Sequence, residues 1–289
     1  MMKRKIGMIL LTLAVLIAVI VSANAQTIQS GPKTRLTVFA AASLKDAFND
    51  IKANYETQHP DVTVVYNFDG SQVLRSQIEQ GATADVFASA NQPQMNQLVG
   101  EGYVDNANVK DFTYNKLALI VPKNNPGKIN SLNDLARPGV KVVVCAKDVP
   151  CGSYTLQLLD NIANSQASGK DFKSKVLNNV VSQETNVNDA VSKVALGEAD
   201  AAFAYVSDVP RKMTNKVTVI PIPDSVNVLA TYPISVLKRS TNQAAANSFV
   251  DYVLSSDGQA ILNNYGFITT SGGIRQPLIV PQPPQTVTA

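Results

Sequence analysis

The sequence has few of the residues that metal-dependent or nucleic-acid-binding proteins need. Among 289 residues there are one histidine, His59, and two cysteines, Cys145 and Cys151. So few potential metal-binding side chains exclude the usual zinc sites, and a single histidine leaves little for a histidine-based catalytic triad. Outside the three basic residues of segment 1–25, the chain has 22 basic and 22 acidic residues. This neutral body argues against nucleic-acid binding, which needs a basic surface.

The first 25 residues have the features of a secretory signal peptide. A basic start at residues 1–5 precedes an apolar run at 6–21, and the small residues at 22–25 fit an A-x-A cleavage site. We therefore expect cleavage after Ala25 and a mature protein in the periplasm or another extracytoplasmic location. An uncleaved N-terminal membrane anchor is the alternative, because the apolar run is only slightly shorter than a membrane span.

Export would permit a disulfide between the two cysteines. Cys145 and Cys151 are six residues apart across a loop that contains Pro150. The spacing does not fix the geometry of the two β-carbons. A disulfide and two free thiols therefore both remain open.

Strand-like and helix-like patterns alternate from residue 35 onward. Leu36–Ala41 is a short apolar run typical of a buried strand, and the apolar residues of Ser43–Tyr55 recur at helical spacing. Further strands are expected at 62–66, 85–88, 117–121, 140–145, 201–205, 216–220 and 232–237, and further helices at 73–79, 93–99, 153–162, 188–196, 244–254 and 258–265. Repeated βα units predict a mostly parallel sheet with helices on both faces.

Loop signals at residues 123–127 and 221–224 indicate a division into two lobes. We expect the chain to cross between them near Asn115 and Ala230. The expected division is a discontinuous first lobe at 34–115 plus 231–275, a second lobe at 116–230, and a Pro-rich extended tail at 276–289.

Four junctions between a strand and the following helix carry small or polar residues. They contain Ser43, Ser71, residues 150–153 and residues 186–188. A helix start offers free N–H groups and a partial positive charge, so several starts that meet could bind an anion without lysine or arginine. A serine before a helix is alternatively only an N-cap, worth about 1 kcal/mol. The pattern alone does not show that the four junctions meet.

Several tracts resemble the periplasmic molybdate-binding proteins of ABC importers. They are VFAAASL at 38–44, GS at 70–71, QIEQGATADVFASA at 77–90, VPCGSY at 149–154, AYVSD at 204–208, YPI at 232–234 and YGF at 265–267. Their order and spacing extend over residues 36–267. The resemblance implies an α/β fold of the two-lobed type II solute-binding class, in which each lobe is a mostly parallel sheet flanked by helices. The ligand would lie in the cleft between the lobes, which close around it.

The resemblance also implies a ligand set for an oxyanion. Ser43 and Ser71 would each give a hydroxyl and a backbone N–H, Cys151 and Val187 would give a backbone N–H, and Tyr205 would give its phenol hydroxyl. Cys151 departs from the family, which usually has a small residue there, and it could narrow the pocket or pair with Cys145. For Tyr205 the alternative is a buried tyrosine with a local partner.

These groups are all hydrogen-bond donors, which suits a fully deprotonated dianion. Phosphate carries a proton at neutral pH and would leave one donor facing another, whereas sulfate is not excluded by charge. The expectation is an exported, monomeric receptor, not an enzyme, that captures molybdate and also tungstate and delivers it to an ABC transporter permease. It needs no cofactor, and the metal is held only through its oxygens. The alternatives are a receptor for sulfate or another tetrahedral oxyanion, and a serine or cysteine hydrolase that uses Ser71 or Cys151. The hydrolase would need a base, and the single histidine, His59, is expected in a loop far from both residues.

Overall fold

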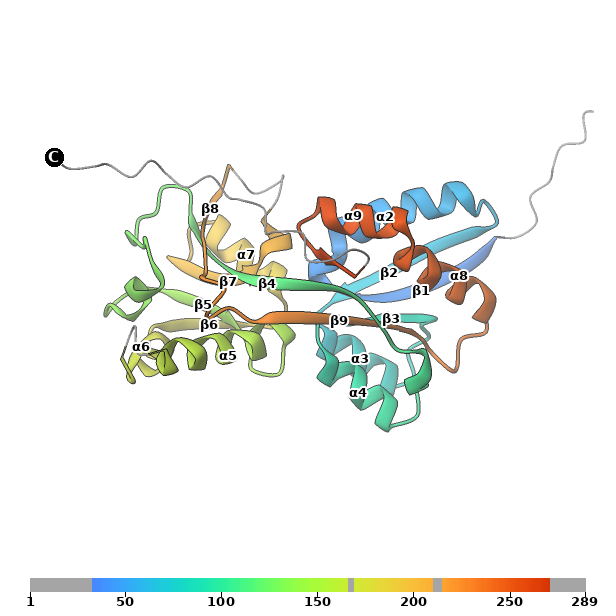
Figure 1. Ribbon diagram of the computed structural model, residues 1–289, viewed down its shortest axis with the longest axis horizontal. Coiled ribbons are helices and arrows are strands. Elements are labelled where there is room, and N and C mark those ends of the chain that lie inside the picture. The colour runs from blue at the N-terminus through green and yellow to red at the C-terminus, as the bar shows by residue number, and fades with distance from the viewer. Residues whose placement is uncertain (1–32, 166–168, 210–214, 271–289) are drawn as a thin grey trace, which may run out of the picture. The chain divides into compact units, whose positions relative to one another are not determined.

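The chain forms an α/β fold in which strands and helices alternate (Figure 1). The computed structural model describes residues 33–165, 169–209 and 215–270, so the expected leader at 1–25 and tail at 276–289 lie outside it. From Thr34 onward the chain forms one compact unit. Within the described ranges, no helix combines the length and apolar character that crossing a membrane requires.

The strands belong to one sheet that has parallel groups at its two ends. Their bounds are Thr34–Ala41 (β1), Val62–Asp69 (β2), Val86–Ala88 (β3), Lys110–Pro122 (β4), Val142–Cys145 (β5), Val180–Glu184 (β6), Ala201–Tyr205 (β7), Val217–Ile220 (β8), Leu229–Val236 (β9) and Ile268–Thr269 (β10). The order is β2-β1-β3-β9-β4-β7-β5-β6, with β8 and β10 also paired to β4. The strands β2-β1-β3 and β7-β5-β6 are parallel, and β9 and β4 join these groups through antiparallel pairs. The sequence predicted the parallel groups but not the antiparallel strands between them.

Helices cover both faces of the sheet, as the alternating pattern predicted. Their bounds are Lys45–Gln58 (α2), Ser71–Glu79 (α3), Gln92–Gly100 (α4), Pro150–Asn164 (α5), Phe172–Asn178 (α6), Val187–Ala195 (α7), Gln243–Leu254 (α8) and Ser256–Asn264 (α9). Figure 1 shows α2, α8 and α9 on one side of β1 and β3, with α3 and α4 on the other side. The helices α5 and α6 pack together beside β5, and α7 packs against β5 and β7.

Strand β1 is buried on both faces, which explains its nearly continuous apolar sequence. Val38 and Ala40 point into the larger hydrophobic core. Phe39 points the opposite way and packs in a second cluster with Leu74 of α3 and Met95 of α4. Because side chains alternate along a strand, one short segment supplies both cores. This packing fixes the end of β1 from which the site is built.

Strand β4 changes its pairing partners in the middle. Asn115 is paired with Ala230 and Lys116 with Leu229 in β9, whereas Leu117 is paired with Tyr205 in β7. The change lies beside the predicted crossing points. The division into lobes at these points stays a prediction, because the residues from Thr34 onward form one unit.

Apart from 3-10 turns, three of the described helices and strands were not predicted from the sequence patterns. Helix α6 has only seven residues, strand β10 has two, and β6 is a partly exposed strand with the polar sequence VVSQE. None of them carries the buried apolar run on which the other predictions rested. The predicted helix at Ser43–Tyr55 is also different at its start, because residues Ala42–Leu44 form a 3-10 turn (η1) before α2.

Candidate functional site

Four chain segments that are far apart in the sequence meet around one small cavity. The cavity is small and partly open to solvent. It is lined by the end of β1 and η1 (Ala41, Ala42, Ser43), the start of α3 (Asp69, Gly70, Ser71), the start of α5 (Val149, Pro150, Cys151), the start of α7 (Asn186, Val187), and by Ala90 and Tyr205. The four junctions singled out in the sequence therefore do meet. All five residues that the resemblance implied as ligands lie in this lining.

Helix N-termini give the cavity its electrostatic character. Helices α3, α5 and α7 begin at the cavity, with Ser71 and Val187 as first residues and Cys151 as the second. The first N–H groups of a helix have no intrahelical acceptor and carry a partial positive charge. Among the described residues, the lining contains no lysine or arginine, and its one carboxylate is Asp69. The cavity thus attracts an anion through dipoles rather than through a cationic side chain.

Neither predicted site serine caps a helix, so the capping alternative is wrong. Helix α3 has Gly70 at its N-cap and α2 has Leu44, and neither helix has a side-chain cap. Ser71 Oγ instead accepts the backbone N–H of Ala90 at 3.0 Å, and Ser43 Oγ lies 3.0 Å from the Tyr232 hydroxyl. Both serine oxygens are held in place by groups from other parts of the chain.

Replacing Ser71 by alanine is expected to lower the free energy of unfolding of the ligand-free protein by about 1–3 kcal/mol, because the buried N–H of Ala90 loses its acceptor. Urea unfolding measures this change. Ser76→Ala, further along α3, is the control, since Ser76 Oγ accepts only an exposed bond from Gln80, and it should cost less than about 0.5 kcal/mol. An unchanged unfolding midpoint for Ser71→Ala would show that Ala90 does not depend on this oxygen.

Tyr205 places an unpaired hydroxyl group beside the cavity. The side chain is 1% exposed, and its oxygen has no hydrogen-bond partner within the described part of the chain. Its ring lies 5.8 Å from that of Tyr232, centroid to centroid. Burial, with smaller contributions from neighbouring polar groups, raises the pKa of Tyr205 well above its ordinary value, so the group stays a neutral donor. A buried polar group without a partner is costly unless a ligand supplies one.

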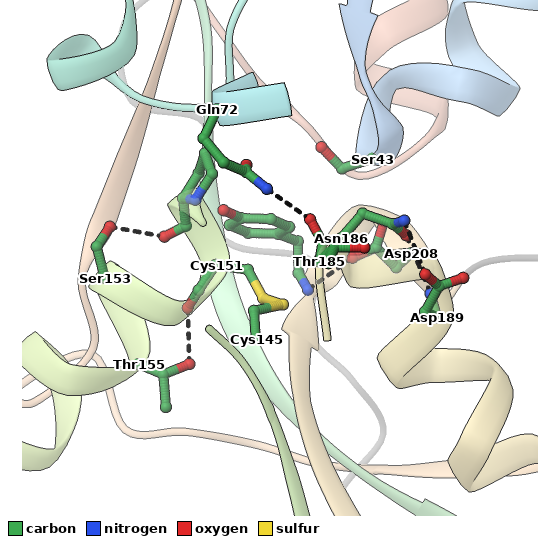
Figure 2. The surroundings of a disulfide bond; sticks show 12 residues. Ser43, Gln72, Cys145, Cys151, Ser153, Thr155, Thr185, Asn186, Asp189 and Asp208 are labelled. Atoms are coloured by element: carbon green, nitrogen blue, oxygen red, sulfur yellow. Dashed lines mark hydrogen bonds between the residues drawn. A yellow bond between two sulfur atoms is a disulfide. The ribbon is translucent and has the colours of Figure 1, made fainter. Parts of the chain in front are cut away.

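A half-buried carboxyl group lies next to Tyr205. Asp208 Oδ2 accepts the backbone N–H of Tyr205 at 2.8 Å, and Figure 2 shows its side chain near the disulfide. Burial raises the pKa of Asp208 to about 7, against the lowering effect of that N–H, and Asp46 adds to the rise. A carboxyl group that is partly protonated near neutral pH repels a bound anion less than a fully charged one would.

The two cysteines form a disulfide, with their Cα atoms 5.8 Å apart (Figure 2). It joins the end of β5 to the start of α5. The next residue, Gly152, lies so close to the end of β5 that a β-carbon there would be 2.0 Å from the carbonyl oxygen of Ala146. The N-terminus of α5, with the Cys151 N–H, is therefore held firmly at the cavity.

Residues 36–268 of the chain match a known protein family, described as bacterial extracellular solute-binding protein. The chain belongs to this family. A relative from Mycobacterium tuberculosis, Molybdate-binding protein ModA, is 38% identical over 260 residues, which cover 88% of this chain and 94% of the relative. Two solved structures show the same fold. The periplasmic molybdate-binding protein of Azotobacter vinelandii has a TM-score of 0.69 at 19% identity, covering 81% of this chain and 98% of its own. The sulfate-binding protein SubI of Mycobacterium tuberculosis has a TM-score of 0.74 at 21% identity, covering 82% and 88%.

The hydrolase alternative finds little support in this solute-binding protein. Cys151 has no free thiol because its sulfur is bonded to Cys145. His59 stacks on Tyr55 at the end of α2, with 4.2 Å between ring centroids, and does not line the cavity. The described ranges also contain no group of three or more histidine, cysteine or acidic residues that could hold a metal ion.

Amide side chains of the solute-binding protein connect segments on different sides of the cavity. Gln72 Nε2 donates to the carbonyl oxygen of Thr185 at 2.8 Å (Figure 2), and Asn188 Nδ2 donates to that of Ala42 at 3.1 Å. Sequence reasoning missed these residues, as it missed Tyr232 as the partner of Ser43. The partners are 113, 146 and 189 residues apart, so no local pattern marks them.

Proposed function

We propose that this solute-binding protein captures molybdate, and also tungstate, and delivers it to an ABC transporter permease in the membrane. The observation that carries the proposal is a small cavity, without lysine or arginine in its lining, in which three helix N-termini meet the Tyr205 hydroxyl, which has no partner among the described residues. Such a cavity supplies hydrogen-bond donors that a bound anion would satisfy. The 38% identity to a protein named for molybdate binding supports the choice of ion.

The proposed ligand set is the one that the resemblance implied. Ser43 and Ser71 would donate their hydroxyls and N–H groups, Cys151 and Val187 their N–H groups, and Tyr205 its hydroxyl. Their common position around the cavity supports these roles. Because Ser71 Oγ already accepts the Ala90 N–H, its own hydrogen is available for the ligand.

A ligand set made of donors favours an ion that carries no proton. Hydrogen phosphate would bring a donor of its own against a protein donor, and an unpaired buried polar group costs about 1–3 kcal/mol. Sulfate, molybdate and tungstate are all proton-free dianions at neutral pH. Only the fit of the larger ions to the cavity separates them from sulfate.

A sulfate receptor is the second candidate function. The sulfate-binding neighbour has the same fold as the molybdate-binding one, and the donor groups do not discriminate by charge. We favour molybdate over sulfate as the proposed ligand because the relative with 38% identity is named a molybdate-binding protein.

The proposal includes the location and partners expected from the sequence. The protein would be exported by the segment at 1–25, act in the periplasm as a monomer, and present the ion to the permease. It would catalyse no reaction and bind no nucleic acid. Its family of extracellular solute-binding proteins supports this setting.

Ligand-dependent thermal unfolding tests the function directly. The purified protein is heated alone and with molybdate, tungstate, sulfate or phosphate. At a hundredfold excess over the Kd, a ligand adds about 2.7 kcal/mol, which raises the Tm of a chain of this size by roughly 5–10 °C. Molybdate and tungstate should produce this shift, and phosphate should not. A shift with sulfate alone would establish the second candidate instead.

A further inference from the structure

A series of buried polar groups extends from Ser43 away from the cavity. The hydroxyls of Ser43 and Tyr232 lie 3.0 Å apart. Burial raises the pKa of Tyr232 well above its ordinary value, and a hydrogen bond from the Asn115 side chain opposes that rise. Tyr232 and Asn115 are both fully buried, and neither lines the cavity. Tyr232 therefore has no direct contact with a ligand, and Ser43 is the cavity residue to which it is hydrogen-bonded.

The strand pairing explains why these side chains meet. Thr113 of β4 is paired with Tyr232 of β9, so their side chains lie on the same face of the sheet. Asn115 is two residues along β4 and shares that face, which makes it a diagonal neighbour of Tyr232 within reach of an aromatic side chain. Leu117 is paired with Tyr205 and continues the same face. The two tyrosines and Asn115 thus form one row beneath the cavity.

The bonds of Asn115 fix the direction of its amide group. Asn115 Oδ1 accepts the backbone N–H of Lys116 at 2.9 Å, and Nδ2 donates to Ser207 Oγ at 2.8 Å. The amide therefore turns its nitrogen, with a second hydrogen, toward the remaining neighbour. A hydroxyl that faces a fixed donor must act as the acceptor there.

We propose that Tyr232 is a positioning residue, which accepts a hydrogen bond from Asn115 and donates its own hydrogen to Ser43 Oγ. Ser43 then has one direction left for its hydrogen, which is the cavity. The proposal rests on the proposed function, since the recipient is the bound oxyanion. Tyr232 would thereby keep Ser43 a donor and prevent it from accepting a proton from a ligand.

In this arrangement a residue that does not touch the ligand contributes to the choice between protonated and proton-free oxyanions. A free serine hydroxyl can rotate and either donate or accept. A serine that already accepts from Tyr232 presents mainly its hydrogen to the ion. Ser43 therefore favours proton-free oxyanions over protonated ones because of a tyrosine in the strand behind it.

A double-mutant cycle on affinity tests the proposal. The Kd of molybdate is measured by calorimetry for wild type, Tyr232→Phe, Ser43→Ala and the double variant. Losing the hydrogen bond that orients Ser43 should weaken binding about three- to tenfold in Tyr232→Phe. In the Ser43→Ala background the same change should have no further effect, because the group it orients is gone.

Two further variants act as control and as second test. Tyr55→Phe also removes a hydroxyl from a fully buried tyrosine, one that donates to Ala245 at 3.3 Å away from the cavity, and it should leave the Kd unchanged. Asn115→Ala should weaken binding in wild type but not in Ser43→Ala, which keeps the test available if Tyr232→Phe does not fold.

The outcomes separate this proposal from the function on which it rests. An unchanged Kd in Tyr232→Phe, or an equal loss with and without the Ser43 hydroxyl, would overturn the positioning role while molybdate binding stands. If the wild-type protein binds none of the three ions molybdate, tungstate and sulfate, the proposed function fails and the positioning role fails with it. If wild type binds only sulfate, the cycle is run with sulfate and decides the role of Tyr232 in the same way.

Discussion

Tyr205→Phe is expected to weaken molybdate binding about 10- to 150-fold, the range that corresponds to losing a hydrogen bond to a charged group. The same substitution should leave the ligand-free protein at least as stable as wild type. The reason is that the Tyr205 hydroxyl is buried without a partner among the described residues, so removing it also removes an uncompensated polar group from the core. Calorimetric titration measures the first effect, and thermal unfolding without ligand measures the second.

Tyr66→Phe provides a matched control with the opposite pattern. The hydroxyl of Tyr66 donates to the carbonyl oxygen of Phe48 at 2.7 Å and lies outside the cavity lining. Its loss should lower the stability of the ligand-free protein by about 1 kcal/mol and leave the Kd unchanged. If Tyr205→Phe behaved like Tyr66→Phe, its hydroxyl would have a structural role and no part in binding.

Gly70→Ala is expected to reduce affinity about 5- to 150-fold, because a β-carbon at Gly70 would overpack the contact between the starts of α3 and α7 at a cost of about 1–3 kcal/mol. A β-carbon at Gly70 would lie 2.4 Å from the carbonyl oxygen of Thr185 and 2.6 Å from the amide group of Gln72. The glutamine side chain can move, but the carbonyl oxygen can move only if the backbone at Thr185 moves with it. The segment that leads into α7 would therefore separate from the start of α3, and the donors on the two sides would no longer reach one ion.

Gly100→Ala is the control for this effect. A β-carbon at Gly100 would meet no other described part of the chain within 4 Å, and the residue lies in the last turn of α4. Alanine there should leave the Kd unchanged and the stability equal or slightly higher. Titration of both variants with molybdate compares them. A Gly70→Ala protein with wild-type affinity would show that Thr185 yields without opening the cavity.

The sequence predicted the fold well where apolar patterns are long. The strand at Leu36–Ala41 and the helix at Ala244–Leu254 each lie within one or two residues of β1 and α8. The patterns failed for β6, whose residues are partly exposed, and for the pairing of β4 with β9. Strand direction depends on where the chain travels between elements, and no local periodicity carries that information.

The candidate site could be predicted only in part. The residues of the lining came from a resemblance over many tracts, and the structure brings them together. The disulfide could not be predicted, because a spacing of six residues allows it without requiring it. In the structure the two sulfurs are bonded, with the Cα atoms 5.8 Å apart. The role of Tyr232 could not be inferred, since its contact with Ser43 joins positions 189 residues apart.

The helix starts at Cys151 and Val187 affect how the sequence of such a site can change in evolution. A backbone N–H is present whatever side chain the residue carries, proline excepted. Substitution scanning would therefore miss these two proposed donors, and sequence drift at both positions would leave the proposed recognition chemistry intact. The side chains there are free to serve other ends, as Cys151 does by tying α5 to β5.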